Sequence, residues 1–102
     1  MPNKNYLRGR RYEWKIRKRL LSQGYYEVCR TAGSKSSFDL IAVDNDLGYT
    51  KYVQCKVLSK GTQADADRMG YKFLDKPPYK KSNHFAQELW VKYGRKEDSY
   101  TC

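Results

Sequence analysis

The part of the sequence that most constrains the fold contains two short apolar runs separated by a turn. Residues 38–44 and residues 49–57 are rich in β-branched and aromatic side chains, and the Asp, Asn and Gly residues of 44–48 lie between them. Two such runs on either side of turn-forming residues predict a β-hairpin. This hairpin limits the chain to folds built around a sheet with antiparallel neighbours.

The rest of the chain has helical and extended patterns. We predict helices at 5–23 and 63–75, further strands at 25–30 and 84–93, a turn at 95–98 and a short edge strand at 99–102. In the first helix, Tyr12, Ile16 and Leu20 recur every four residues, and Gly24 ends the pattern. The order αβββαβ predicts a single α/β domain over residues 1–102 with a central mixed sheet.

Composition limits the size of the core and the kind of partner. The chain has 102 residues, of which 39% are hydrophobic, enough for one modest core. Its formal net charge of +10 favours nucleic acid as the partner, because Lys and Arg side chains release the counterions condensed on a polyanion. A membrane surface is the less favoured alternative, since no basic helix has a long apolar face. With no apolar leader or spanning segment, we expect an intracellular protein.

The cysteines and the histidine narrow the metal chemistry. Cys29, Cys55 and Cys102 are odd in number and far apart, so we expect two buried thiols and one terminal thiol in a reducing cytoplasm. The single histidine, His84, cannot form a multi-histidine site. Carboxylates must therefore hold any metal ion.

The predicted hairpin brings polar side chains together. With a period of two, Gln54 and Lys56 share one face of their strand, and Asp39 shares its face with Ile41 and Val43. Pairing of the two strands places Asp39 beside the strand that carries Gln54 and Lys56. A carboxylate, an amide oxygen and an ammonium group can thus meet at one sheet edge.

Glu13 can add a second carboxylate to this edge. It lies three residues before Ile16, and therefore near the buried face of its helix. Oxygen donors suit Mg²⁺ or Mn²⁺, which stabilise charge on a reacting phosphate and acidify a bound water that a lysine can orient. Taken singly, Asp39 is explained as a turn residue, Lys56 as protection of an edge strand and Glu13 as a helix-dipole carboxylate. Together they favour metal-assisted phosphodiester hydrolysis.

Three stretches of the sequence resemble a known nuclease family. Residues 9–13, residues 30–42 and residues 54–57 are similar to the archaeal Holliday junction resolvases of the PD-(D/E)XK superfamily. The most specific part is the run from Arg30 to Lys35 that leads to Asp39. The resemblance covers about residues 7–57 and implies a restriction-endonuclease-like core, Mg²⁺- or Mn²⁺-dependent cleavage of branched DNA, an archaeal or viral origin and a homodimer with two active sites.

The resemblance also implies roles for individual residues. The implied catalytic residues are Glu13, Asp39, Gln54, Lys56 and, near the scissile phosphate, Ser34. The implied metal ligands are Asp39, Gln54, Glu13 and the backbone carbonyl of Cys55. Arg30 and Lys35 are expected to contact DNA phosphates.

Two positions depart from the family pattern. Gln54 occupies the place of the ExK glutamate, and Trp14 occupies a place that usually holds arginine. Glutamine keeps an oxygen ligand but loses a negative charge, so we expect weaker binding of the divalent ion. Glutamine is found here in other branches of the superfamily, including viral and phage-like nucleases.

Two other classes of function remain open. One is a catalytically silent DNA-binding protein on the same fold, whose first helix follows the phosphate backbone. Its candidate phosphate contacts are Arg8, Arg10, Arg11, Arg17, Lys18 and Arg19. The other is a protein-interaction adaptor that uses some of the ten tyrosines. Metal dependence separates the enzyme from both alternatives, and salt dependence separates DNA binding from the adaptor.

Overall fold

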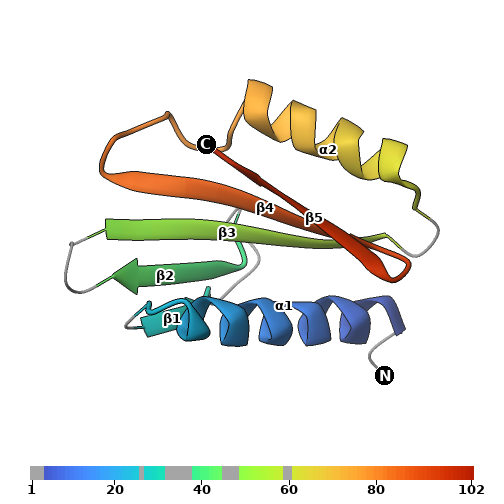
Figure 1. Ribbon diagram of the computed structural model, residues 1–102, viewed down its shortest axis with the longest axis horizontal. Helices are drawn as coiled ribbons and strands as arrows, with labels where there is room; N and C mark the ends of the chain where they lie inside the picture. The colour runs from blue at the N-terminus through green and yellow to red at the C-terminus, as the bar shows by residue number, and fades with distance from the viewer. Residues whose placement is uncertain (1–3, 26, 32–37, 45–48, 59–60) are drawn as a thin grey trace.

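The computed structural model describes residues 4–25, 27–31, 38–44, 49–58 and 61–102. Its elements in chain order are α1 (Lys4–Ser22), β1 (Glu27–Arg30), β2 (Leu40–Asp44), β3 (Tyr49–Leu58), α2 (Gln63–Asp75), β4 (Phe85–Tyr93) and β5 (Lys96–Thr101) (Figure 1). This arrangement confirms the predicted α/β class with a mixed sheet, to which β5 adds a full strand.

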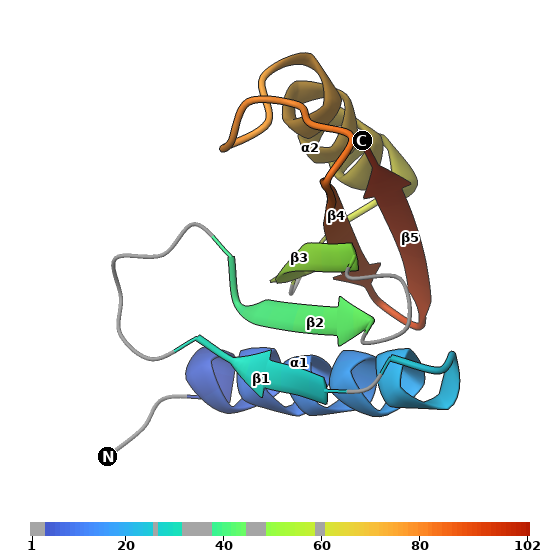
Figure 2. The ribbon, with the colours of Figure 1, turned by 90° about the vertical axis from the view of Figure 1, so that its left-hand side faces the viewer.

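The five strands form one sheet in the order β1-β2-β3-β4-β5. The β3–β4 pair is parallel, and the other neighbouring pairs are antiparallel. Two parallel neighbours need a crossover connection, and α2 supplies it. The two helices lie on opposite faces of the sheet, α1 against β1–β3 and α2 against β4 and β5 (Figures 1 and 2).

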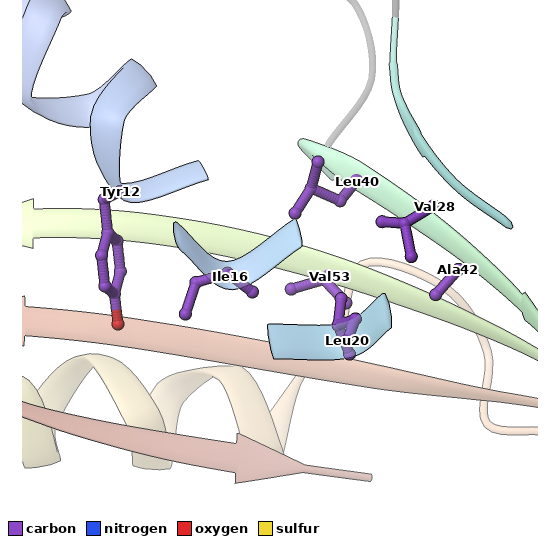
Figure 3. Packing of buried hydrophobic residues seen from close by; sticks show 7 residues of the cluster. All are labelled: Tyr12, Ile16, Leu20, Val28, Leu40, Ala42 and Val53. Atoms are coloured by element: carbon purple, nitrogen blue, oxygen red, sulfur yellow. The ribbon is translucent and has the colours of Figure 1, made fainter. Parts of the chain in front are cut away.

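Each helix covers its own hydrophobic core. Tyr12, Ile16 and Leu20 of α1 are buried, as their spacing predicts. They pack against Val28, Leu40, Ala42 and Val53 (Figure 3). The core under α2 consists of Phe38, Ala66, Phe73, Leu89, Val91 and Tyr93. The first helix ends before Gly24, whose φ of 100° is accessible to glycine at little cost.

The second helix has the bounds that its pattern predicts. Thr62 and Asp65 form a capping box at its start. Gly70 lies directly against the ring of Tyr100. A Cβ at this position would come within 2.3 Å of that ring, which explains why the helix contains a glycine here. The Tyr100 hydroxyl in turn donates to Asp67 Oδ1 at 2.8 Å, which ties β5 to α2.

Two predictions at the ends of the sheet are wrong. The sequence predicts a turn at 95–98, but the turn consists of Gly94 and Arg95. Tyr93 already pairs with Lys96, so residues 96–98 belong to β5. The charged residues that suggested a turn are tolerated in an edge strand, where Asp98 accepts a hydrogen bond from the Tyr93 hydroxyl at 2.8 Å. Cys29 is exposed, since Val28 takes the buried position of β1.

None of the described helices is long and apolar enough to cross a membrane.

Candidate active site and cationic cavities

Asp39 lies at a break in the pairing of β2 with β3. Its backbone N–H donates to the Val53 carbonyl at 2.9 Å, while the next residue, Leu40, is the register partner of Val53. Two residues therefore oppose one, as in a β-bulge. Phe38 accordingly packs in the core under α2 and Leu40 in the core under α1. The regular alternation that predicted a shared face for Asp39, Ile41 and Val43 is interrupted here.

The bulge directs the Asp39 side chain onto the backbone of β3. Asp39 Oδ2 accepts a hydrogen bond from the Cys55 N–H at 2.8 Å. Cys55 stands between Gln54 and Lys56, so the carboxylate is held at their level along the strand. On the other side, the Thr31 N–H donates to the Asp39 carbonyl at 3.0 Å, and the Thr31 hydroxyl donates to the Phe38 carbonyl at 2.7 Å.

Glu13 approaches the same region from the flank of α1. Its carboxylate is partly buried and accepts from Arg30 Nε at 2.9 Å. Burial raises the pKa of Glu13, and the negative charge of Asp39 raises it further, while Arg30 and Arg10 oppose the shift. The two carboxylates are thus close enough to influence each other electrostatically.

Gln54 and Lys56 share a face of β3, as alternation predicts, but this face lies toward α2. They line a cavity of about 320 Å³ together with Lys72 and Lys76 from the end of α2 and beyond it. Glu13 is part of α1 and therefore lies on the opposite side of the sheet. The predicted residues therefore form two groups on either side of β3, with the Asp39 carboxylate bonded to the backbone between them.

Lys72 and Lys76 line this cavity, and the sequence analysis does not predict them as candidate site residues. Their four-residue spacing at the end of a predicted helix places them on one face. This signal alone does not show that the face looks onto Gln54 and Lys56, because that contact depends on the crossover connection.

The donor chemistry of the region is that of oxygen. Within the described residues, no group of three or more His, Cys, Asp or Glu side chains is arranged to hold a metal ion. Asp39, Glu13 and the Gln54 amide offer oxygen donors, which suit Mg²⁺. In an antiparallel pair the N–H and C=O of one residue point toward the same neighbour, so the Cys55 carbonyl is directed to the side of β3 where Asp39 lies. Burial, followed by the charges of Asp39, Glu13 and Glu88, raises the pKa of the Cys55 thiol, which leaves this sulfur protonated.

A second cationic cavity lies on the other flank of α1. It has a volume of about 370 Å³ and is bordered by the ends of β3 and β4. Its cationic lining residues are Arg8, Arg11, Lys15 and Lys92. Arg8 and Arg11 are predicted DNA contacts, whereas Lys15 and Lys92 are new. Helical spacing places the three α1 residues on one flank, but only the fold brings Lys92 to them.

Other predicted DNA contacts have partners within the protein. Arg17 Nε donates to the Val28 carbonyl at 2.9 Å, and Arg19 pairs with Glu97 at 2.6 Å. Arg10 and Lys18 are exposed on α1. Ser34 and Lys35 lie outside the described residues.

Comparison with known proteins identifies a similar fold. No family model matches the sequence, and no curated protein matches it either. Among solved structures, the chain is similar to Hjc of Archaeoglobus fulgidus, a Holliday junction resolvase from an archaeal hyperthermophile. The TM-score is 0.56 at 13% sequence identity, over 91% of this chain and 71% of that chain. The fold is therefore resolvase-like.

Proposed function

We propose that the protein is a divalent-metal-dependent endodeoxyribonuclease of the PD-(D/E)XK type that cuts branched DNA, four-way junctions in particular. The observation that carries the proposal is the Asp39 carboxylate bonded to the Cys55 N–H, between Gln54 and Lys56. This carboxylate interacts with Glu13 in a resolvase-like fold that has cationic cavities on both sides of the sheet.

Each residue has a part in this chemistry. Asp39 and the Cys55 carbonyl, which lie at the edge of β3 between the two groups, would hold Mg²⁺ or Mn²⁺ together with Glu13 from the α1 side and Gln54 from the α2 side. The bound ion would stabilise charge on the phosphate and lower the pKa of a coordinated water. Lys56 orients the attacking water. Lys72 and Lys76, which line the same cavity as Lys56, bind phosphates next to the scissile one.

The remaining cations position the DNA. The cavity of Arg8, Arg11, Lys15 and Lys92 binds the backbone away from the cut. We further propose a homodimer, as the resemblance to the resolvases implies, so that two active sites act on opposed strands of a junction.

A catalytically silent DNA-binding protein is the second candidate. It is favoured by the neutral Gln54 and by the pairing of Glu13 with Arg30, which together reduce the negative charge available to a cation. The adaptor has less support, because Tyr12 and Tyr93 are core residues and only Tyr71 and Tyr79 are among the large exposed side chains described.

One assay separates the three functions. Labelled four-way junction, duplex and single-stranded DNA are incubated with the protein in Mg²⁺ or in EDTA. We expect the junction to be cut in Mg²⁺ and to remain intact in EDTA. Junction binding without cleavage in either Mg²⁺ or Mn²⁺ would assign the silent DNA-binding protein, and no DNA binding would leave the adaptor.

A further inference from the structure

A third cavity lies beside the carboxylates, on the outer side of the α1–β1 contact. It has a volume of about 310 Å³. Its apolar lining comes from Val28 and Leu40, which are almost fully buried, and from Trp14. Glu13, Arg17 and Arg30 also line it, so the cavity shares Glu13 with the candidate active site.

Trp14 is an unusual residue at this position. Its side chain is 51% exposed, so a large apolar surface that burial would stabilise is left in contact with solvent. Arg17 lies over the indole with its guanidinium carbon 5.4 Å from the ring centroid. Because Arg17 also bonds to the Val28 carbonyl at 2.9 Å, this neighbour of the indole is fixed in place. The aromatic surface is thus supported before any ligand arrives.

The size and charge of the cavity restrict its occupant. Its volume is at the lower end of the roughly 300–1,000 Å³ of ligand pockets, which suits a single planar ring system and excludes a helix of a partner protein. Arg17 and Arg30 outnumber Glu13, which pairs with Arg30, so the lining keeps a net positive charge that attracts an anionic ligand and opposes a second copy of this cationic chain. A planar base that carries phosphates meets both requirements.

We propose that this cavity binds one unpaired nucleobase of the DNA, stacked on Trp14 next to Glu13. The proposal rests on the DNA binding of the proposed function and adds a substrate class: DNA with at least one unstacked nucleotide at the cut site. Stacking on an aromatic side chain tolerates any base, so the site selects for an unpaired structure and not for sequence.

The test uses a strand with 2-aminopurine at one unpaired position, titrated in EDTA so that no cleavage occurs. The fluorescence of this base falls when it stacks. We expect quenching with the wild-type protein, its loss in Trp14→Leu and its retention in Trp14→Phe. Affinity for the strand should fall on the order of ten- to a hundredfold in Trp14→Leu, with an unchanged salt dependence because no charge is removed.

Two controls identify the source of the effect. Tyr71→Leu removes another exposed aromatic, 65% exposed on α2, and should leave quenching and affinity unchanged. A strand of the same length with abasic sites keeps the phosphates but lacks the bases. The wild-type protein should bind this abasic strand more weakly than the strand with bases. Trp14→Leu should bind the two strands equally.

The outcomes distinguish this inference from the proposed function. The base site would be overturned if the wild-type protein bound the abasic strand as tightly as the strand with bases, or if quenching were unchanged in Trp14→Leu. In either case, Mg²⁺-dependent junction cleavage would still support the proposed nuclease. A change of sedimentation from dimer to monomer in Trp14→Leu, with quenching retained, would place Trp14 in a protein interface and also overturn the base site. Absence of DNA binding by the wild-type protein would reject both proposals.

Discussion

Asp39 combines a structural role with the chemical role that we propose for it. Its backbone completes the bulge between β2 and β3, and its carboxylate accepts the Cys55 N–H at 2.8 Å. An asparagine could still accept that hydrogen bond through its amide oxygen but would carry no charge. The chemical role can therefore be removed with little change to the local fold.

Gln54 gives the first prediction. Gln54→Glu restores the carboxylate that the resolvase pattern has at this position, and it adds a negative charge beside a divalent ion. The Mg²⁺ concentration for half-maximal junction cleavage should therefore fall, or activity should appear if the wild-type protein is silent. A metal titration checks this, with Gln63→Glu on α2 as a control that adds the same charge elsewhere. Identical titrations for Gln54→Glu and the wild-type protein would mean that Gln54 is not a ligand.

At this scale the sequence predicts candidate site residues, but it does not predict how each side chain is directed. Gln54 and Lys56 share a face because a regular strand alternates. Asp39 departs from alternation because the two-against-one pairing with Val53 depends on both strands at once. No single residue in 38–40 signals that bulge.

Among the elements, α1 is joined to β5 by Glu97. The Tyr12 hydroxyl donates to Glu97 Oε2 at 3.0 Å, and Arg19 reaches Oε1 at 2.6 Å. Burial tends to raise the pKa of Glu97, but the hydrogen bonds from Arg19 and Tyr12 outweigh it and lower the pKa below its usual value. The charged form of Glu97 therefore stabilises the folded state.

Glu97→Gln should lower the free energy of unfolding by about 1–2 kcal/mol at pH 7, since hydrogen bonds to a charged acceptor are lost. The stabilisation by Glu97 is complete above the usual glutamate pKa and is lost as pH falls through the lowered folded-state pKa. The difference between the two proteins should thus shrink in acid. Urea unfolding at neutral and acidic pH measures it, and Asp75→Asn, an exposed change on α2, should have little effect. A difference that is zero at pH 7 would contradict this role.

The elements themselves are largely predictable, with one instructive exception. The Tyr12, Ile16 and Leu20 stripe is sufficient to define α1, because one apolar face must be buried. In contrast, β5 begins at Lys96, with charges that are typical of a turn. In the strand, Asp98 contacts Tyr93 across the turn, and Glu97 contacts Tyr12 and Arg19 of α1. The contacts of Glu97 join residues far apart in the sequence, so local patterns do not predict them.

The whole molecule separates its charges across α1. One flank carries the cavity of Arg8, Arg11, Lys15 and Lys92, and the other carries Glu13 and its neighbours. The DNA backbone away from the cut is therefore expected on the first flank, while the scissile phosphate is expected near the carboxylates that would hold the ion.

The salt dependence of DNA binding tests this arrangement. With six or more phosphate contacts, affinity should fall on the order of a thousandfold between about 50 and 200 mM salt. Replacing Arg8, Arg11 and Lys15 with Gln should flatten the slope of log K against log salt by up to about three units. Arg17 is kept, because it holds the Val28 carbonyl. The matched triple change of Arg68, Lys80 and Lys81, on the α2 side, removes the same charge and should flatten the slope less. Equal slopes for the two triple variants would reject the cavity as the phosphate site.

The most direct measurement is junction cleavage by the wild-type protein, Asp39→Asn and Lys56→Ala, each in Mg²⁺ and in EDTA, with junction affinity measured in parallel. We expect the wild-type protein to cut in Mg²⁺ alone. Both variants should lose cleavage by at least about a hundredfold, because the ion's ligand or the residue that orients the water is missing. Their affinity for the junction should stay within a few-fold, since the main phosphate contacts lie elsewhere. Full activity in either variant, or cleavage in EDTA, would contradict the assignment of a metal-dependent nuclease centre at Asp39.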